Sequence, residues 1–293
     1  ELRHDAAVGR VHRDLARGGH LMVNIRKFTG VAFSSLDELV EHGMLGVEAA
    51  RFLRAVVSAR LSMVVSGAPG SGKTTLLNCA AGHLDPSLRV VVAEEVFETD
   101  VPLANVASMQ TRGGRGEREE VTLRQLVAGF LRMAPDVAIV GEVRDDEALP
   151  LLRTLSSGVK GYTTIHAGSA RQALTRLRFV SQLADAGRNL PLSALNTLVC
   201  EAVDVVVHTE RTADGPRVIE ILAVEDLAGG PDAAQFTVTP VFERARLDGP
   251  LAWSGLVPVR VKTALDRSGI ALDDVLPMQR AANRRGEVAE VSP

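Results

Sequence analysis

SGAPGSGKTTLLNC, residues 66–79, follows the apolar run LSMVV without a break and decides the fold. The spacing of Gly67 and Gly72-Lys73-Thr74 is the phosphate-binding pattern G-x-x-x-x-G-K-[ST]. Glycines in such a loop adopt dihedrals that side chains forbid, so backbone N–H groups can converge on phosphate oxygens. A glycine turn with a chance lysine is the alternative, but the position between a strand-like and a helix-like run favours phosphate binding.

The pattern predicts what individual residues do. Lys73 is expected to reach the β and γ phosphates of a nucleotide, and the Thr74 hydroxyl is expected to bind Mg²⁺. The helix that begins near Thr74 adds the positive end of its dipole. ATP and Mg²⁺ are therefore the expected cofactors. The loop residues expected to contact the nucleotide are Gly67, Ala68, Pro69, Gly70, Ser71, Gly72, Lys73, Thr74 and Thr75.

Composition excludes several classes of protein. The 293 residues, 46% of them hydrophobic and only 3% aromatic, suffice for one large domain and a smaller one with an aliphatic core. A net charge of −3 argues against a protein whose whole surface tracks nucleic acid. Cys79 and Cys200 are too few for a disulfide framework or a four-thiolate zinc site, and we expect buried thiols in a reducing cytoplasm.

The chain also lacks the long apolar run of a membrane protein. No run approaches the roughly 18 to 20 residues that a span needs, and the amino end is charged rather than signal-like. We therefore expect a cytoplasmic protein that is connected to a membrane only through partners. Because the chain begins at Glu1 rather than methionine, we expect a fragment of a longer protein.

Short apolar runs alternate with helical periods along the middle of the chain. Continuous Val/Ile runs are typical of strands buried on both faces. After the run that ends at Val65, strands are expected at residues 89–94, 136–141, 161–166, 203–209 and 217–225. Helices are expected at residues 49–59, 75–81, 123–133, 148–155, 170–183 and 192–199. This alternation predicts an α/β fold with a mostly parallel sheet covered on both faces.

The flanks differ from this central part. Residues 1–48 contain one strand-like piece, LMVNIRKF, and a short helix at residues 36–41. After Gly229-Gly230-Pro231 the pattern changes to the alternation of an edge strand, and the last fifteen residues are polar. We therefore predict three parts: an amino-terminal part with a linker (1–48), which the family resemblance described below implies is the remnant of a domain, a nucleotide-binding domain (49–229) and a C-terminal extension (230–293).

Acidic residues stand where two of the expected strands end. Glu142 follows a buried run at the carboxyl edge of the sheet, where doubly wound folds place their ligands, and offers a carboxylate to Mg²⁺. Glu94, Glu95 and Glu98 follow the run VVVA, and carboxylates so close repel one another unless a metal or cations compensate. A solvated acidic loop is the alternative for either set.

Spacing alone does not decide the role of two further groups of residues. His166 ends the run YTTI, and a histidine at a strand end can be structural as readily as catalytic. Arg112, Arg115 and Arg118 lie in the glycine-rich segment TRGGRGER, where they could reach a phosphate or belong to a solvated loop. The negative charges of Glu117, Glu119 and Glu120 would weaken the attraction of these arginines for a phosphate.

In their order, these motifs resemble the secretion and pilus-assembly ATPases of type II and type IV secretion, most closely the tight-adherence pilus and type IV secretion branch. The matching text is SGAPGSGKTTLLN, then AEEVFE as the acidic box, then LVAGFLRMAPDVAIVGEVRDDEAL around the Walker B glutamate, then SGVKGYTTIHAGSARQALTRL as the histidine box. Upstream, IRKF, LDELVEHGML and FLRAVVSARL resemble the junction between that family's two domains.

The resemblance implies a RecA-like P-loop NTPase domain, preceded by a truncated α+β amino-terminal domain. It implies that Glu98 polarises the attacking water, that Glu142 stands near the metal, and that His166 senses the nucleotide or links subunits. The implied metal ligands are Thr74, Glu142 and Glu95. Arg26 and Arg112 match arginines that approach the phosphates in relatives, whereas Arg124 and Arg144 match motif arginines without an assigned role.

Some residues depart from the family pattern. Glu94-Glu95 replaces the usual Glu-Asp of the acidic box, which can shift a metal contact. Gly158-Val159 replaces a Gly-His pair and so removes an imidazole from the histidine box. Pro150 costs a helix hydrogen bond unless it lies in the first turn.

The implied function is that of a homohexameric ATP-hydrolysing motor that powers pilus assembly or secretion across the bacterial envelope. Its implied partner is a polytopic inner-membrane platform protein, which would place the motor at the periphery of the membrane. No direct contact with nucleic acid is expected. Two alternatives remain: a DNA-translocating RecA-like ATPase, and a regulatory subunit that binds ATP without hydrolysing it. The cargo cannot be read from motifs that pilus assembly, protein secretion and conjugation have in common.

Overall fold

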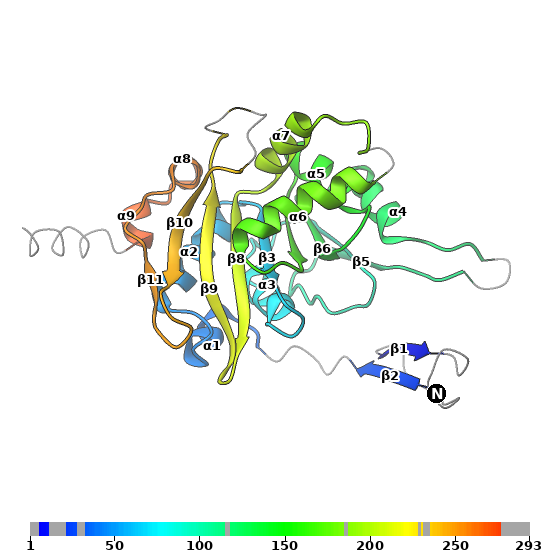
Figure 1. Cartoon of the computed structure of the whole chain (residues 1–293), viewed down its shortest axis with the longest axis horizontal. Helices are drawn as coiled ribbons and strands as arrows, with labels where there is room; N and C mark the ends of the chain where they lie inside the picture. Colours follow the sequence, from blue (N-terminus) through cyan, green and yellow to red (C-terminus); the bar gives the residue numbers. More distant parts are fainter. Residues whose placement is uncertain are drawn as a thin grey trace, which may run out of the picture.

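The computed structural model describes the backbone of residues 6–11 and 22–27 and the full structure of residues 33–114, 118–184, 187–227, 230 and 235–276. Nine of the described strands form one sheet (Figure 1). In spatial order they are β11 (Leu251–Trp253), β10 (Val238–Arg244), β9 (Gly215–Val224), β8 (Val205–Thr212), β3 (Met63–Gly67), β7 (Lys160–Ile165), β6 (Val137–Val143), β4 (Val90–Glu94) and β5 (Val106–Gln110).

The sheet is parallel from β8 to β5 and antiparallel from β8 to β11. Its strand interiors are continuous valine and isoleucine runs, as expected for strands buried on both faces. The predicted α/β fold with a mostly parallel sheet is therefore confirmed.

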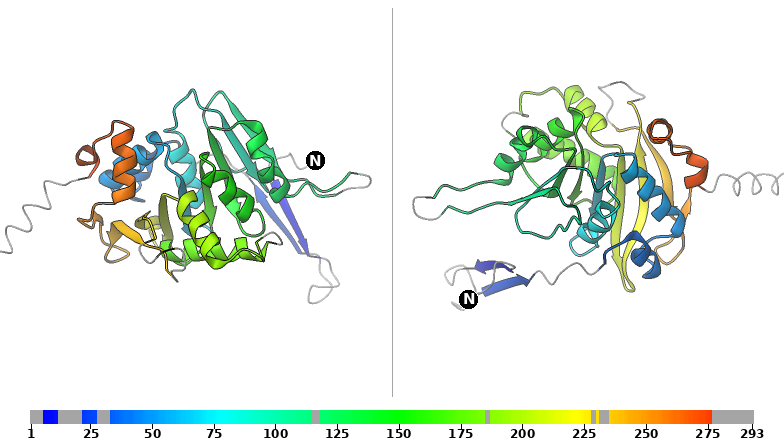
Figure 2. Two further views of the ribbon diagram at one scale, coloured as in Figure 1. Left: turned by 90° about the horizontal axis from the view of Figure 1, so that it is seen from above. Right: turned by 180° about the vertical axis from the view of Figure 1, so that it is seen from behind.

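Helices cover both faces of the sheet (Figure 2). Successive residues of a strand point to opposite faces, so Met63 and Val65 of β3 pack into one core and Val64 into the other. The first core contains α1 (Leu36–Glu41), α2 (Val47–Ser58), α3 (Lys73–Ala81), α8 (Val259–Arg267) and α9 (Leu272–Val275). The second contains α4 (Leu123–Ala128), α5 (Ala148–Ser156), α6 (Ala170–Leu183) and α7 (Leu192–Ala202).

The expected elements between residues 49 and 225 are present, with one correction. The continuous helix predicted for residues 123–133 is wrong: α4 ends at Ala128, and a 3₁₀ helix, η2 (Phe130–Met133), follows. Gly129 weakens the helix at the break, and Ala134 takes a left-handed conformation just before Pro135. Pro150 lies in the first turn of α5, where its missing N–H has no intrahelical partner to lose.

The C-terminal residues join the same sheet and core. β10 and β11 extend the sheet beyond β9, and Val261, Leu265 and Leu272 of α8 and α9 are buried in the first core. The described part of the predicted extension is thus packed on the nucleotide-binding part, and a domain boundary near residue 230 stays a prediction.

The amino-terminal residues form a small antiparallel sheet of their own. β1 (Ala6–Val11) pairs with β2 (Met22–Lys27), and Arg26 of β2 lies opposite Ala7. The strand predicted in LMVNIRKF is confirmed by β2. No helix in the described part of the chain is both long and apolar enough to cross a bilayer.

Candidate nucleotide-binding site

The phosphate-binding pattern forms the loop between β3 and α3, at the carboxyl end of a central strand. Gly67 and Gly72 have positive φ values of 153° and 88°, which side chains rarely adopt. A Cβ at Gly67 would lie 2.2 Å from the carbonyl oxygen of Thr209, so only glycine fits. Residues 68–70 at the tip of the loop are exposed, whereas Ser71 and Lys73 are buried.

Lys73 lies at the base of this loop with its ammonium group held in place. Its Nζ donates to the carbonyl of Ala68 at 3.1 Å and lies 3.2 Å from Nδ1 of His166, the residue that follows β7. The side chain is fixed inside the loop, at the N-terminus of α3, where a cation and the helix dipole both attract anions.

His166 connects Lys73 to Glu142 of β6. Its Nε2 lies 2.6 Å from Oε1 of Glu142. The two atoms are close enough for an ion pair, yet their geometry makes no hydrogen bond, so this buried oxygen has no hydrogen-bond partner among the described residues. Nδ1 faces Nζ of Lys73 and, also at 3.2 Å, the carbonyl oxygen of Gly67, so the imidazole contacts the backbone of the loop as well as its lysine.

Arg144 joins the Walker B strand to the acidic box. Its Nε donates to Oε2 of Glu142 at 2.8 Å, and its Nη1 donates to Oε2 of Glu95 at 2.9 Å. Burial lowers the pKa of Arg144, but the charges of Glu142 and Glu95 outweigh this effect and raise it above its usual value. The guanidinium therefore stays charged and neutralises two neighbouring carboxylates.

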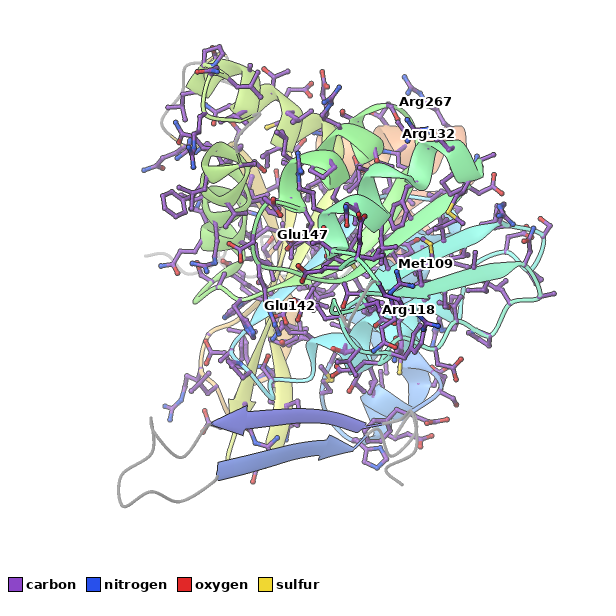
Figure 3. The ribbon with its side chains drawn as sticks, turned by 90° about the vertical axis from the view of Figure 1, so that its right-hand side faces the viewer. Met109, Arg118, Arg132, Glu142, Glu147 and Arg267 are labelled. Atoms are coloured by element: carbon purple, nitrogen blue, oxygen red, sulfur yellow. The ribbon has the colours of Figure 1, made fainter. Side chains whose placement is uncertain are left out.

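The turn after β6 is fixed by a buried carboxylate. Oε1 of Glu147 accepts the backbone N–H groups of Arg144 at 2.5 Å and of Asp145 at 2.9 Å. Figure 3 shows Glu142 and Glu147 on the side of the molecule where β6 gives way to α5. Glu147 thus holds the backbone from which Arg144 reaches the acidic side chains.

The acidic box is held by hydrogen bonds from both of its sides. Oε1 of Glu94, which is buried, accepts from the N–H and hydroxyl groups of Thr99 at 2.9 and 2.6 Å and from the N–H of Glu98 at 3.3 Å. Burial raises the pKa of Glu94, and the hydrogen bonds, which act to lower the pKa, do not cancel this effect. The amide of Asn78, one turn beyond Thr74 in α3, donates to the carbonyl of Glu98 at 3.0 Å and ties the box to the phosphate loop.

The structure brings together most of the residues that the sequence singled out. Lys73, His166 and Glu142 form one chain of contacts, Glu95 joins it through Arg144, and the backbone of Glu98 is tied to α3.

Two of the predicted arginines are not placed in this cluster. Arg112 pairs with Val121 in the segment that follows β5, and its Nη2 donates to the carbonyl of Glu119. The side chain of Arg26 lies outside the described residues. Their approach to phosphates stays a prediction.

The residues present fit a magnesium-bound nucleotide. The loop offers glycine backbone and a buried lysine to phosphates, and the orphaned oxygen of Glu142 is the kind of acceptor that a cation or its bound water would satisfy. Mg²⁺ is commonly held by one or two carboxylates together with substrate phosphates and water. In the described residues, no group of three or more His, Cys, Asp or Glu side chains is arranged to hold a metal by itself.

Sequence reasoning did not identify the roles of three groups that organise the site. Asn78 lies in the helix that follows the phosphate loop, and no sequence pattern indicates that its amide bonds to the acidic box. Arg144 was noted without a role, although its position two residues after Glu142 could have suggested a pair. Thr209 lies within β8, 138 residues beyond Ser71, and only the parallel pairing of β3 with β8 brings their hydroxyls to 2.9 Å.

Comparisons of sequence find related proteins. The family model described as Type II/IV secretion system protein matches residues 16–213. The conjugal transfer protein TrbB of Rhizobium radiobacter is 34% identical over 194 residues, which cover 65% of this chain and 56% of TrbB. The type IV secretion system protein PtlH of Bordetella pertussis is 37% identical over 165 residues, covering 55% of this chain and 49% of PtlH. The chain therefore spans about half the length of these curated relatives.

Solved structures have the same fold. The VirB11 ATPase of the Brucella suis type IV secretion system, crystallised with sulphate, superposes with a TM-score of 0.55 and 25% identity over 75% of this chain and 71% of that one. The Legionella pneumophila ATPase DotB gives a TM-score of 0.53 over 75% of this chain and 58% of its own, and at 20% identity it supports the fold alone. The predicted resemblance and the RecA-like fold are confirmed, and the chain belongs to the type II/IV secretion system protein family.

Proposed function

We propose that this chain is the nucleotide-binding part of an ATP-hydrolysing motor that powers pilus assembly or secretion across the bacterial envelope. The observation that carries the proposal is the contact chain from Lys73 through His166 to Glu142 at the base of the phosphate loop. A loop that only bound phosphate would not need a carboxylate and an imidazole aligned behind its lysine.

Each residue then has a task. Lys73 and the N–H groups of the loop bind and orient the phosphates, while Thr74 and Glu142 hold Mg²⁺, with Glu95 as a further ligand. Bound Mg²⁺ neutralises phosphate charge and polarises the bond that breaks. Glu98 orients the attacking water, and Arg26 and Arg112 approach the phosphates from outside the contact chain.

The proposed assembly is a homohexamer on the cytoplasmic side of the inner membrane. It would act on a polytopic platform protein of a pilus or secretion system and not directly on nucleic acid. Support comes from the family, whose members TrbB and PtlH are named for conjugal transfer and type IV secretion. Closure of the amino-terminal residues over bound ATP, and their release after hydrolysis, would supply the movement.

The test is magnesium-dependent phosphate release by the full-length protein and its Lys73→Ala variant. We expect the variant to lose activity by a factor of at least about 10³, because the lysine stabilises charge in the transition state. Full activity in the variant would contradict the proposal. Tight ATP binding without phosphate release in the wild-type hexamer would favour a regulatory subunit. Stimulation by single-stranded DNA that weakens steeply with salt would favour a DNA translocase.

A further inference from the structure

The end of β8 contacts the phosphate loop through a buried threonine. The hydroxyl of Thr209 donates to the carbonyl of Ser66 at 3.1 Å and lies 2.9 Å from the hydroxyl of Ser71 in the loop. Thr209 and Ser71 are fully buried. A hydroxyl pair shielded from water has no solvent to replace a lost partner, so its hydrogen bond fixes the orientation of both side chains.

Two more contacts come from the hairpin that β8 forms with β9. Nη1 of Arg211 donates to the carbonyl of Gly70 at 3.2 Å. A Cβ at Gly72 would lie 2.9 Å from Cβ of Pro216, so the hairpin also packs against the last glycine of the loop. Three neighbouring loop residues, at positions 70, 71 and 72, thus rest against one hairpin, which Figure 1 shows beside β3 and α3.

The shape of the loop depends on this support. A phosphate loop binds only when its N–H groups converge, so the affinity of a loop that samples other shapes falls in proportion to the fraction of time that it spends in the binding shape. Inside the loop, the N–H of Ser71 donates to the carbonyl of Ala68 at 3.2 Å, a distance at the long end for such a bond. Contacts from outside the loop must therefore help to hold its curvature.

We propose that Thr209 is a positioning residue for nucleotide binding, which acts through Ser71 to keep the phosphate loop in its binding shape. This inference deepens the proposed function and rests on it. Thr209 does not touch the nucleotide. It orients Ser71 in the phosphate loop, and the other contacts of the β8–β9 hairpin hold the neighbouring loop residues in place.

The experiment measures the dissociation constant of a fluorescent ADP analogue for the full-length protein and its variants, together with the thermal unfolding midpoint. Thr209→Val keeps the shape and removes the hydroxyl with its bonds to Ser66 and Ser71, and we expect affinity to fall about fivefold to tenfold, as for loss of the buried hydrogen bond to the loop. Thr209→Ser restores the hydroxyl and should bind within about twofold of the wild type. Ser71→Ala tests the same bond from the loop side, should Thr209→Val not fold.

Thr154→Val is the matched control. Thr154 is also a buried threonine whose hydroxyl donates to a carbonyl, that of Pro150 at 2.9 Å, but it lies in α5. We expect this variant to lower the unfolding midpoint and leave the dissociation constant unchanged. In the double variant of Ser71 and Thr209, affinity should fall no further than in Thr209→Val alone, because that change already removes the hydroxyl bond to Ser71.

The outcomes separate this inference from the proposed function. If the wild type binds the ADP analogue and Thr209→Val binds it equally well, the positioning role is overturned and the proposed function stands. Equal affinity losses in Thr209→Val and Thr154→Val, or additive losses in the double variant, would also overturn it, since they would reflect general destabilisation or independent effects. A wild-type protein that binds no nucleotide would overturn both.

Discussion

Nδ1 of His166 lies 3.2 Å from Nζ of Lys73, although 93 residues separate them in the chain. The pairing follows from the topology, because β3 and β7 are parallel neighbours and the residues after them emerge at the same edge of the sheet. The lysine that would meet the phosphates therefore touches the imidazole that meets Glu142.

We expect His166→Ala to reduce turnover about tenfold or more with little change in ATP affinity. Removing the imidazole takes one partner from Lys73 and leaves Glu142 without the group that faces its orphaned oxygen, so alignment for the reaction suffers more than binding does. Phosphate release at varied ATP concentrations measures both constants. His42→Ala, at an exposed histidine whose Nδ1 lies 2.8 Å from the carbonyl oxygen of Glu38 and whose ring packs against Phe33, should leave both unchanged. A large rise in KM alone would assign His166 to nucleotide binding.

Among the acidic-box glutamates, Glu98 should be the one whose amide variant stops turnover. Glu94 is buried and bound by Thr99, and Glu95 is paired with Arg144, whereas the backbone of Glu98 is fixed next to the phosphate loop. We expect Glu98→Gln to lower turnover by about 10² or more while ATP still binds, as for a missing general base. Single-turnover phosphate release and nucleotide titration measure the two effects. A larger loss in Glu95→Gln would move the role to that residue.

Arg144 should not tolerate replacement by lysine. Its guanidinium donates to Glu142 and Glu95 at once through different nitrogens, and a single ammonium group cannot reproduce that fork. We expect Arg144→Lys and Arg144→Ala to reduce turnover to a similar degree, about tenfold, and to shift the Mg²⁺ concentration that gives half-maximal activity, since one cation no longer bridges the two carboxylates. Arg246→Lys, in an exposed pair with Asp248, serves as the control. Wild-type behaviour of Arg144→Lys would show that only the charge matters.

The fold could be predicted wherever the signal was local. The loop at Lys73 and the valine runs of β4 and β6 carry their own patterns, and both were assigned correctly. β5 was missed because its residues, VASMQ, are half-buried and mixed in polarity at the edge of the sheet. The helices α8 and α9 were also missed: α9 has only four residues, whereas the apolar positions Val261 and Leu265 of α8 do have helical spacing and were overlooked.

The site was predicted by residue type more than by geometry. Sequence motifs named Lys73, Glu142 and His166, but they did not show that the imidazole lies between the other two. Such a contact depends on strand order in the sheet, which no local pattern encodes. The role of Asn78 was hidden for the same reason, because a single amide in a helix has no partner in its own sequence neighbourhood.

Asp204 should be a major source of stability for the C-terminal residues. This buried carboxylate accepts from Lys160 at 2.9 Å, from Arg260 of α8 at 2.7 Å and from the N–H of Ser62 at 2.8 Å. We expect Asp204→Ala to lower the free energy of unfolding by about 3 kcal/mol, the lower end for a broken buried pair because both cations are partly exposed.

Denaturant titration measures this free energy, and Asp248→Ala is the matched control. Asp248 makes only an exposed contact with Arg246, so its loss should cost less than about 0.5 kcal/mol. Equal losses in the two variants would show that the buried cluster contributes no more than a surface pair.

His208 should make folding weaken as the pH falls. The imidazole is buried in β8 beside Ser66 of β3, where Nδ1 lies 3.0 Å from the hydroxyl of Ser66 and Nε2 lies 3.5 Å from Oε1 of Glu210, with Glu220 opposite on β9. Burial lowers its pKa from the usual 6.5, and the attraction of Glu220 and Glu210 does not cancel this effect. The unfolded chain therefore takes up a proton at higher pH than the folded one, and stability present above about pH 6.5 is lost as the pH falls toward the folded pKa. Denaturant midpoints between about pH 7.5 and 5.5 measure the slope, which His208→Gln should flatten because the amide does not titrate there. An unchanged slope in that variant would show that other groups cause the acid sensitivity.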